Sequence, residues 1–159
     1  MSEITIREGR LEDMPAVHAL IRELADYEKE LDAVETTAEI FAQDGFGERP
    51  YFECFVAEDE SDGVVGVCLF YFAYSTWKGK MIYLDDLIIT ESHRRKGIGQ
   101  MLLQKLATYG HENDAALVRW QVLDWNEPAI NMYKKIGAEI DETWYNCTIR
   151  RQKMANWDA

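Results

Sequence analysis

The sequence predicts an α/β protein of the α+β kind, in which one mixed β-sheet is flanked by helices. The first observation is the length, because 159 residues suit one domain with one hydrophobic core, and 47% of them are hydrophobic. The second is the order of the segments, which reads β-α-α-β-β-β-α-β-α-β. The third is a continuous run of strand-forming residues, 64–74, that a short turn joins to a second such run. We therefore expect residues 1–159 to form a single domain.

The N-terminal part of the chain predicts a strand and two helices. Ile4 and Ile6 alternate with polar residues, as they do in a short strand. Four apolar residues at i, i+3, i+4 and i+7 then give one helix an apolar face: Val17, Leu20, Ile21 and Leu24. Thr36 and Glu39 form a capping-box pattern for a short second helix, which we expect to end at Gly45.

The middle of the chain predicts three strands in succession. Residues 51–58 have a strand-like pattern, and Gly63 leads into the run 64–74. This run is too continuous and too rich in β-forming residues for a surface helix. The turn 77–80 closes a hairpin onto the next predicted strand, 81–90.

The last third predicts two helices and two strands. The first helix ends near Gly110, and a strand follows at 116–123. Its apolar face begins with three residues: Ile98, Leu102 and Leu106. Pro128 stands where the first residue of a helix would, and we expect that helix to run to Gly137. Residues 144–150 form the last predicted strand.

The charge balance argues against a nucleic-acid partner. The chain has 17 basic and 29 acidic residues, a net charge of −12, whereas affinity for a duplex comes from basic groups that neutralise phosphates. The negative charge is consistent with solubility alone and also with a site that attracts cations.

No metal site, disulfide framework or membrane anchor is predicted. The cysteines are odd in number and lack metal-ligand spacing, which indicates buried thiols in a reducing cytosol. They are Cys54, Cys68 and Cys147. The three histidines are scattered in the same way: His18, His93 and His111. The start of the sequence lacks signal-peptide features, and its longest apolar stretch is about half the roughly 20 residues of a membrane span. We expect a soluble cytoplasmic protein with no membrane contact.

Residues 94–99 read Arg-Arg-Lys-Gly-Ile-Gly and lie between a predicted strand and an amphipathic helix. Gly97 and Gly99 allow a ligand to approach the backbone closely, and the first amides of the following helix point at an anion. The three cations add charge, as Lys134 and Lys135 do later in the chain. These features predict an anionic ligand, and a solvated basic turn is the alternative.

Two nucleotide-binding motifs fit this segment poorly. A P-loop needs Gly-Lys-Ser/Thr, whereas Gly99 is followed by Gln100 and Met101. A Rossmann fingerprint needs a third glycine and an acidic residue about 20 positions further on, at the tip of the next strand. Leu102 stands at the glycine position, and the next predicted strand ends only at 123–124.

The same segment resembles the pyrophosphate loop of the GNAT N-acetyltransferases, whose pattern is R/Q-x-x-G-x-G/A. The resemblance covers nearly the whole chain. Four further segments resemble the spermidine/spermine N-acetyltransferase branch: Asp-Gly-Phe-Gly at 44–47, Tyr-Leu-Asp-Asp at 83–86, Asp-Trp-Asn-Glu-Pro at 124–128 and Asn-Met-Tyr at 131–133. Residues 74–79 and 122–126 resemble its thialysine-acetylating members. The resemblance implies the GNAT acyl-CoA N-acyltransferase fold, with a mostly antiparallel sheet, and acetyl-CoA as cosubstrate without a metal.

The resemblance also assigns residues that bind the cosubstrate. Arg94 would place a charge near the pyrophosphate, and backbone amides of the basic loop would cradle it: Arg95, Lys96, Gly97, Ile98, Gly99 and Gln100. The backbone of the central strand would pair with the pantetheine arm and polarise the thioester carbonyl at Leu87, Ile88 and Ile89, whose side chains also suit a core. Asn126 resembles a residue that helps to hold acetyl-CoA, although capping of the helix that begins near Pro128 explains it equally well.

Catalytic and acceptor-binding residues follow from the same resemblance. Tyr133 matches the general acid of the family, because a phenol with a reference pKa of about 10 stays protonated and can donate to a leaving thiolate. A core tyrosine is the alternative. Asp85 stands where these enzymes usually carry Glu, and its shorter side chain favours a water relay or cation binding over direct proton abstraction. Asp86 and the pair Tyr27 and Glu28 resemble the acceptor-binding residues, since carboxylates and aromatic rings suit an ammonium. Solvated pairs at a strand end and a helix end are the alternatives here.

The sequence thus predicts an enzyme that transfers acetyl from acetyl-CoA to a primary amine of a small cationic molecule. The expected acceptor is a diamine, a polyamine or a lysine analogue such as thialysine, and attack is direct, in a ternary complex. Acetylation of a protein N-terminus or lysine is one alternative, and a non-catalytic acyl-CoA sensor is another. The resemblance further implies a homodimer, to which the late β-rich segment 144–150 would contribute.

Overall fold

The structure is a computed structural model that describes residues 2–157. Its internal contacts divide the chain into two compact units, Met1–Gln121 and Val122–Ala159, each of which is described by itself. Within the described part, no helix is both long enough and apolar enough to cross a membrane.

The first unit is built on one five-stranded sheet with the order β1-β2-β3-β4-β5. The strands are β1 Ile4–Glu8, β2 Glu53–Asp59, β3 Gly63–Ser75, β4 Gly79–Ile89 and β5 Val118–Arg119. The pairings from β1 to β4 are antiparallel, and β4 pairs with β5 in parallel. The predicted mixed, mostly antiparallel sheet is therefore confirmed.

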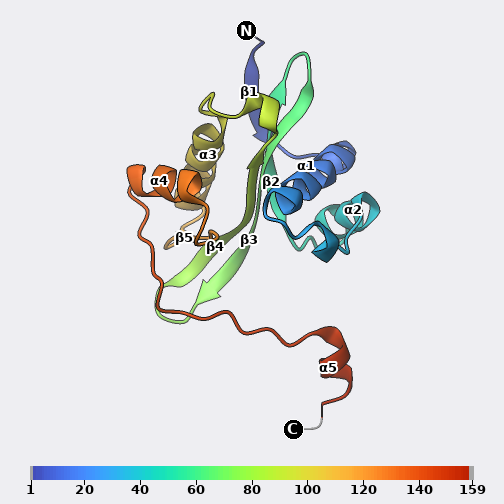
Figure 1. The fold of residues 1–159 in the computed structure, drawn as a ribbon, viewed down its shortest axis with the longest axis vertical. Helices are drawn as coiled ribbons and strands as arrows, with labels where there is room; N and C mark the ends of the chain where they lie inside the picture. Colours follow the sequence, from blue (N-terminus) through green and yellow to red (C-terminus); the bar gives the residue numbers. More distant parts are fainter. Residues whose placement is uncertain (1, 158–159) are drawn as a thin grey trace. The chain divides into compact units, whose positions relative to one another are not determined.

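Helices cover both faces of this sheet. Helices α1 (Met14–Tyr27) and α2 (Ala38–Phe46) lie on one side, and α3 (Ile98–Glu112) lies on the other (Figure 1). Short 3-10 turns precede the three helices: Leu11–Asp13, Leu31–Ala33 and Glu91–His93. The last of these turns connects β4 to the basic loop.

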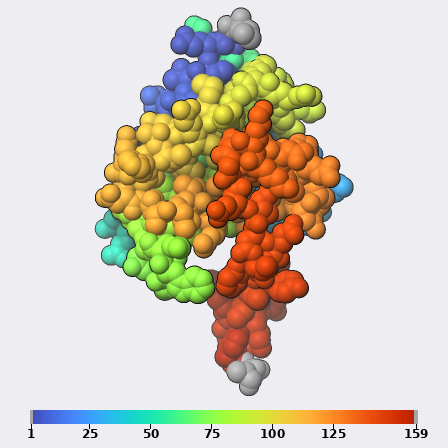
Figure 2. All heavy atoms as spheres, turned by 90° about the vertical axis from the view of Figure 1, so that its left-hand side faces the viewer, coloured from blue at the N-terminus to red at the C-terminus, as the bar shows by residue number. Residues whose placement is uncertain are grey.

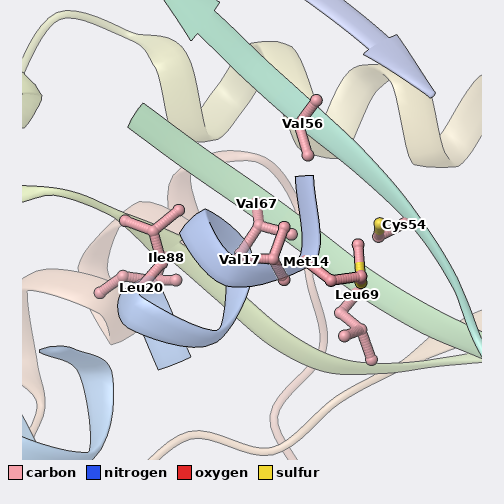
Figure 3. Close-up of a cluster of buried hydrophobic side chains, with 8 residues drawn as sticks. All are labelled: Met14, Val17, Leu20, Cys54, Val56, Val67, Leu69 and Ile88. Atoms are coloured by element: carbon pink, nitrogen blue, oxygen red, sulfur yellow. The ribbon is translucent and has the colours of Figure 1, made fainter. Parts of the chain in front are cut away.

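The predicted apolar face of α1 is confirmed. Met14, Val17 and Leu20 are buried against side chains from β2, β3 and β4 (Figure 3). The residues they meet are Cys54, Val56, Val67, Leu69 and Ile88. Because full burial of each such side chain contributes roughly 1.5–3 kcal/mol, this cluster fixes α1 on the sheet. The C-terminal end of α1 is thereby held beside the second half of β4.

The opposite face of the sheet carries an aromatic cluster that holds α3. The ring of Tyr109 lies 5.4 Å from that of Phe55, 5.6 Å from Phe70 and 6.0 Å from Phe72, measured between centroids. Edge-on and tilted contacts of this kind add to the energy of burial. Helix α3 is thus anchored at its C-terminal half, and its N-terminal end meets the basic loop.

The start and end of α2 differ from the prediction. Its N-cap is Thr37 rather than Thr36, and the Thr37 hydroxyl accepts a hydrogen bond from the Ile40 amide at 3.2 Å. The helix continues past Gly45, which we expected to end it. Gly45 is instead needed for packing, since a Cβ there would lie 2.5 Å from the Phe52 ring.

In the last third of the chain, one strand and one helix are shorter than predicted. The strand predicted at 116–123 shrinks to β5, because it pairs with β4 only at Ile82 and Tyr83. Helix α4 (Glu127–Lys135) begins beside Pro128, as predicted, but ends before Gly137.

The prediction of a last strand at 144–150 is wrong for the described chain. All seven residues are exposed and extended without a strand partner, and the short helix α5 (Arg151–Ala155) follows them (Figure 2). A β-rich composition does not form a strand unless another strand lies beside it. A local turn forms instead, in which Asp141 accepts hydrogen bonds from Thr143 and from the Trp144 indole.

The cysteines agree only in part with their predicted packing role. Cys54 and Cys68 are buried, and this burial raises the pKa of each thiol to about 12. Cys147 is exposed, so its assignment to the core is wrong. It lies in the segment 144–150, which we expected to be covered as a strand.

Candidate active site

The basic loop has the geometry of an anion-binding helix start. Gly97 is the N-cap of α3 and has the left-handed φ of 80°, and Arg95 has a φ of 64°. The first helical hydrogen bond runs from the Met101 amide to the Gly97 carbonyl at 3.1 Å. The amides of residues 98–100 therefore precede any helical acceptor and point, with the positive end of the helix dipole, out of the helix.

The three cations of this loop have different surroundings. Arg95 and Lys96 are exposed beside the free amides. Arg94 is half-buried and turns towards α1, where its Nη2 lies 3.2 Å from a Glu23 carboxylate oxygen. Its Nε donates to the Ile89 carbonyl at 2.9 Å. Its guanidinium also lies 5.4 Å from the centre of the Tyr27 ring. Arg94 therefore contacts protein groups, whereas Arg95 and Lys96 are free to approach an anion.

The second half of β4 has a neighbouring strand on one side only, among the described strands. Pairing with β5 ends at Tyr83, and beyond it β4 pairs with β3 alone. The β3–β4 register also skips one residue, because Leu69 pairs with Asp86 and Phe70 with Leu84. Asp85 is therefore a bulge residue, and bulges redirect side chains and interrupt a ladder.

The predicted cofactor residues of β4 lie along this edge. Ile88 is buried in the core cluster, as the alternative interpretation required, while Leu87 and Ile89 are half-buried. Their backbone groups on the side away from β3 have no strand beside them in the described chain. An extended ligand with amide groups can pair with such an edge.

Acidic groups gather where β4 meets the end of α1. Burial raises the pKa of Asp86 to about 7, and the neighbouring charges of Asp85 and Glu28 add to the rise. Burial also raises the pKa of Glu28, the residue that follows α1. The structure thus brings together three of the four predicted acceptor-binding residues from two distant segments. The fourth, Tyr27, is 41% exposed on the last turn of α1 and contacts Arg94.

Two tyrosines on adjacent strands accompany this acidic cluster. Tyr71 of β3 pairs with Tyr83 of β4, and their rings stack with centroids 5.4 Å apart. Burial raises the pKa of both phenols, and the charge of Asp85 contributes. A carboxylate beside the face of an aromatic ring is a favourable environment for an ammonium ion.

In the second unit, the predicted site residue Tyr133 lies on α4, and Asn126 lies directly before the first residue of that helix. The Asn126 side chain accepts a hydrogen bond from the Ala129 amide at 3.5 Å, which makes it the N-cap of the helix. The capping interpretation of Asn126 is therefore confirmed. Tyr133 is 8% exposed.

Comparison with known proteins identifies the fold and the family. The model of the acetyltransferase (GNAT) family matches residues 17–138, which include all but the first three residues of α1, the strands β2 to β5, the basic loop and α4. The chain belongs to the GNAT family of acetyltransferases. Members of the family use acetyl-CoA as cosubstrate. This GNAT protein is accordingly an N-acetyltransferase.

Among curated GNAT relatives, thialysine N-epsilon-acetyltransferases are prominent. The chain is 42% identical to the Bos taurus enzyme of that name over 146 residues, which are 87% of this chain and 86% of the relative. It is 34% identical to spermidine/spermine N(1)-acetyltransferase-like protein 1 of Homo sapiens, with 97% of this chain but 24% of the relative aligned.

Solved structures confirm the GNAT fold. An integron cassette protein from the mobile metagenome of V. cholerae superposes with a TM-score of 0.77 at 23% identity, covering 98% of this chain and 97% of that one. An aminoglycoside acetyltransferase from an uncultured soil metagenomic sample gives 0.76 at 21% identity, covering 92% and 97%.

Sequence reasoning missed three groups of residues in this GNAT protein. The sequence patterns give no role to Glu23 or to the stacking of Tyr71 on Tyr83, although these residues lie beside predicted site residues. His93 also has partners that its position in the sequence does not reveal, since its Nε2 lies 3.4 Å from Asp59 and 3.3 Å from Asp62. These three side chains are grouped closely enough to hold a cation. Hydrogen bonds from the Ser2 hydroxyl and from backbone amides lower the pKa of Asp59 to about 2.

Proposed function

We propose that this chain transfers the acetyl group of acetyl-CoA to a primary amine of a small cationic molecule. The observation that carries the proposal is the acidic cluster of Asp85, Asp86 and Glu28 beside the open edge of β4. An acidic site attracts an ammonium, and the adjacent strand edge suits the amide-bearing pantetheine arm. A net charge of −12 favours the approach of small cations in particular.

The residues fit the cosubstrate at two places. The amides of residues 98–100, together with Arg95 and Lys96, would hold the pyrophosphate at the start of α3. The backbone of Leu87, Ile88 and Ile89 would pair with the pantetheine arm along the open side of β4. When bound there, acetyl-CoA supplies a thioester as the electrophile.

Replacement of Gly97 by Val tests the anion site. Valine is strained at a φ of 80°, and the expected result is a dissociation constant for CoA raised about tenfold or more, measured by titration calorimetry. Gly79→Val is the matched control, because Gly79 also has a left-handed φ, 98°, and open space around its Cβ position. The control should lose stability and keep its CoA affinity. Equal loss of CoA affinity in both folded variants would refute the assignment.

Asp86 is the residue that we propose as the base. An alkylamine with a pKa of about 10 arrives as an ammonium and must lose a proton before it attacks. A carboxylate whose pKa is raised to about 7 accepts that proton far more readily than one at its ordinary value. The resemblance had pointed to Asp85, whose exposed position on the bulge suits contact with the cation.

Tyr133 is proposed as the general acid, on the match of residues 131–133 to the family motif. As the tetrahedral intermediate collapses, the C–S bond breaks and the thiolate takes the phenol proton. The attacking nitrogen gives up its remaining extra proton, which restores the phenol through solvent and leaves the neutral amide. The amine attacks the thioester carbonyl directly, so no acyl-enzyme forms.

The acceptor is proposed to be thialysine or another small amine with a second cationic group. The names of the relatives support this class, and they include an L-ornithine N5-acetyltransferase of Arabidopsis thaliana at 36% identity over 104 residues. The experiment incubates the protein with acetyl-CoA and a panel of amines while free thiol is monitored. Thiol release with thialysine or polyamines supports the proposal. Release only with peptides favours a protein acceptor, and CoA binding without any release favours a sensor.

We further propose that the protein is a cytoplasmic homodimer. The exposed apolar side chains of Trp144, Tyr145 and Ile149 support the dimer, because a second copy would cover them. The free, buried thiols of Cys54 and Cys68 agree with a cytoplasmic setting. Light scattering at micromolar protein should give twice the chain mass of 18.5 kDa. A mass of one chain would overturn the dimer.

A further inference from the structure

Glu23 on α1 binds three groups of the segment that leads into the basic loop. One carboxylate oxygen accepts from the Glu91 amide at 2.9 Å and from Arg94 Nη2 at 3.2 Å. The other accepts from the Thr90 hydroxyl at 2.9 Å. One side chain of α1 therefore holds the residue that follows β4, the 3-10 turn and the first residue of the loop.

Arg94 extends this connection in two directions. It reaches back to the Ile89 carbonyl, and it lies over the ring of Tyr27, one helical turn after Glu23. The side chains of Glu23 and Arg94 are 33% and 34% exposed, so their ion pair contributes little through charge alone. Glu23 instead acts through geometry. Its three hydrogen bonds, together with the bond from Arg94 to the Ile89 carbonyl, fix the backbone of residues 89–94, which lead into the basic loop.

We propose that Glu23 is a positioning residue for the pyrophosphate loop, which it orients through Arg94, Thr90 and the Glu91 amide; this inference rests on the proposed function. Arg94 acts here as one of the groups that hold the loop in place, together with Glu23, and not as a phosphate ligand. Anion affinity then comes from the amides of residues 98–100 with Arg95 and Lys96, and these groups converge only while the loop entrance is held.

Glu23→Gln is the first test, with CoA binding measured by titration calorimetry. Glutamine has nearly the same shape, but its amide nitrogen cannot accept from the donors that surround the carboxylate. We expect the dissociation constant for CoA to rise about tenfold, in line with loss of hydrogen bonds to a charged group. Asp26→Asn removes the same charge from an exposed position on the same helix and should leave CoA affinity unchanged. An unchanged or tighter CoA complex in folded Glu23→Gln would overturn the inference.

A second donor separates positioning of the loop from general damage. S-acetylpantetheine carries the same thioester and arm as acetyl-CoA but lacks the pyrophosphate. Glu23→Gln should raise KM for acetyl-CoA about tenfold with little change in kcat, and should change kcat/KM for S-acetylpantetheine less than about twofold. Equal losses with both donors would show that Glu23 supports the fold as a whole, and the inference would fail.

A double-variant cycle tests the claim about Arg94. If Arg94 acts through its contact with Glu23, Arg94→Gln should weaken CoA binding in the wild-type background. In the Glu23→Gln background the same substitution should cause little further loss of CoA affinity. Full additivity would identify Arg94 as an independent phosphate ligand and overturn the inference.

Should Glu23→Gln fail to fold, Thr90→Val removes one of the contacts of Glu23 with a side chain of similar shape. This variant should also raise the dissociation constant for CoA. Absence of CoA binding by the wild-type protein would overturn the proposed function itself, an outcome distinct from the others.

Discussion

Tyr133→Phe should lower turnover by about 10²–10⁴, roughly 3–5 kcal/mol of transition-state stabilisation at about 1.36 kcal/mol per tenfold. The phenol is proposed to protonate the departing thiolate, an interaction that is stronger in the transition state than in the ground state. Phenylalanine keeps the ring of this residue, which is 8% exposed, so the fold and the dissociation constant for CoA should be nearly unchanged. Turnover and melting temperature are measured on the same preparation.

Tyr109→Phe is the matched control for this experiment. Tyr109 lies on α3, and its hydroxyl donates a hydrogen bond to the Glu53 carboxylate of β2 at 2.6 Å. It has no proposed role in the reaction. Its replacement should lower the melting temperature and leave turnover intact. Wild-type turnover in well-folded Tyr133→Phe would remove Tyr133 from the mechanism, and the general acid would have to be sought elsewhere.

Asp86→Asn should lower turnover about 10²-fold near neutral pH, because the variant has no carboxylate to accept the ammonium proton. Since the pKa of Asp86 is raised to about 7, the wild-type rate should increase as pH rises through that value, and the variant should lack this step. The deficit should shrink at about pH 9 and above, where more of the amine arrives already neutral. Rate profiles against pH for both proteins decide the matter.

The same substitution should have the opposite effect on stability. A carboxyl whose folded pKa lies above its unfolded value binds more protons in the folded state, so its contribution to stability falls as pH rises from about 4 to about 7. Asparagine remains neutral, and the variant should therefore gain melting temperature relative to wild type at about pH 8 and gain less at about pH 5. Asp85→Asn is the comparison. If that variant loses the pH-dependent step while Asp86→Asn keeps it, the base is Asp85.

Local patterns were sufficient for most of the first unit. The periodicity of Val17, Leu20 and their neighbours identified the face of α1 that packs on the sheet, because helical spacing places these residues in one row. The basic loop was identified from its glycines and cations, and it does lie at the start of α3, where Gly97 has a left-handed conformation that few other residues adopt at low cost. Both features depend on residues that are close together in the chain.

Features that depend on distant residues were not predictable in this way. Glu23 and Arg94 are 71 positions apart, and only the packing of α1 beside the end of β4 brings them together. The proposed assignment of the base to Asp86 and of the cation contact to Asp85 depends on a bulge in the β3–β4 register, which no local pattern in the sequence marks. The strand predicted at 144–150 was wrong for a related reason. Its composition suits a strand, but the described chain has no strand beside it.

The one-sided pairing of the second half of β4 bears on whether the protein aggregates at high concentration. A strand edge with free donors and acceptors is a template on which foreign strands add, and it promotes aggregation. On β4 the bulge at Asp85 breaks the even spacing that an incoming strand requires, and it places a charge at the break. An incoming polypeptide would have to match the interruption, whereas a thin, flexible ligand can follow it. The irregular register therefore lets the sheet keep an edge open for a small molecule while it resists self-association along that edge.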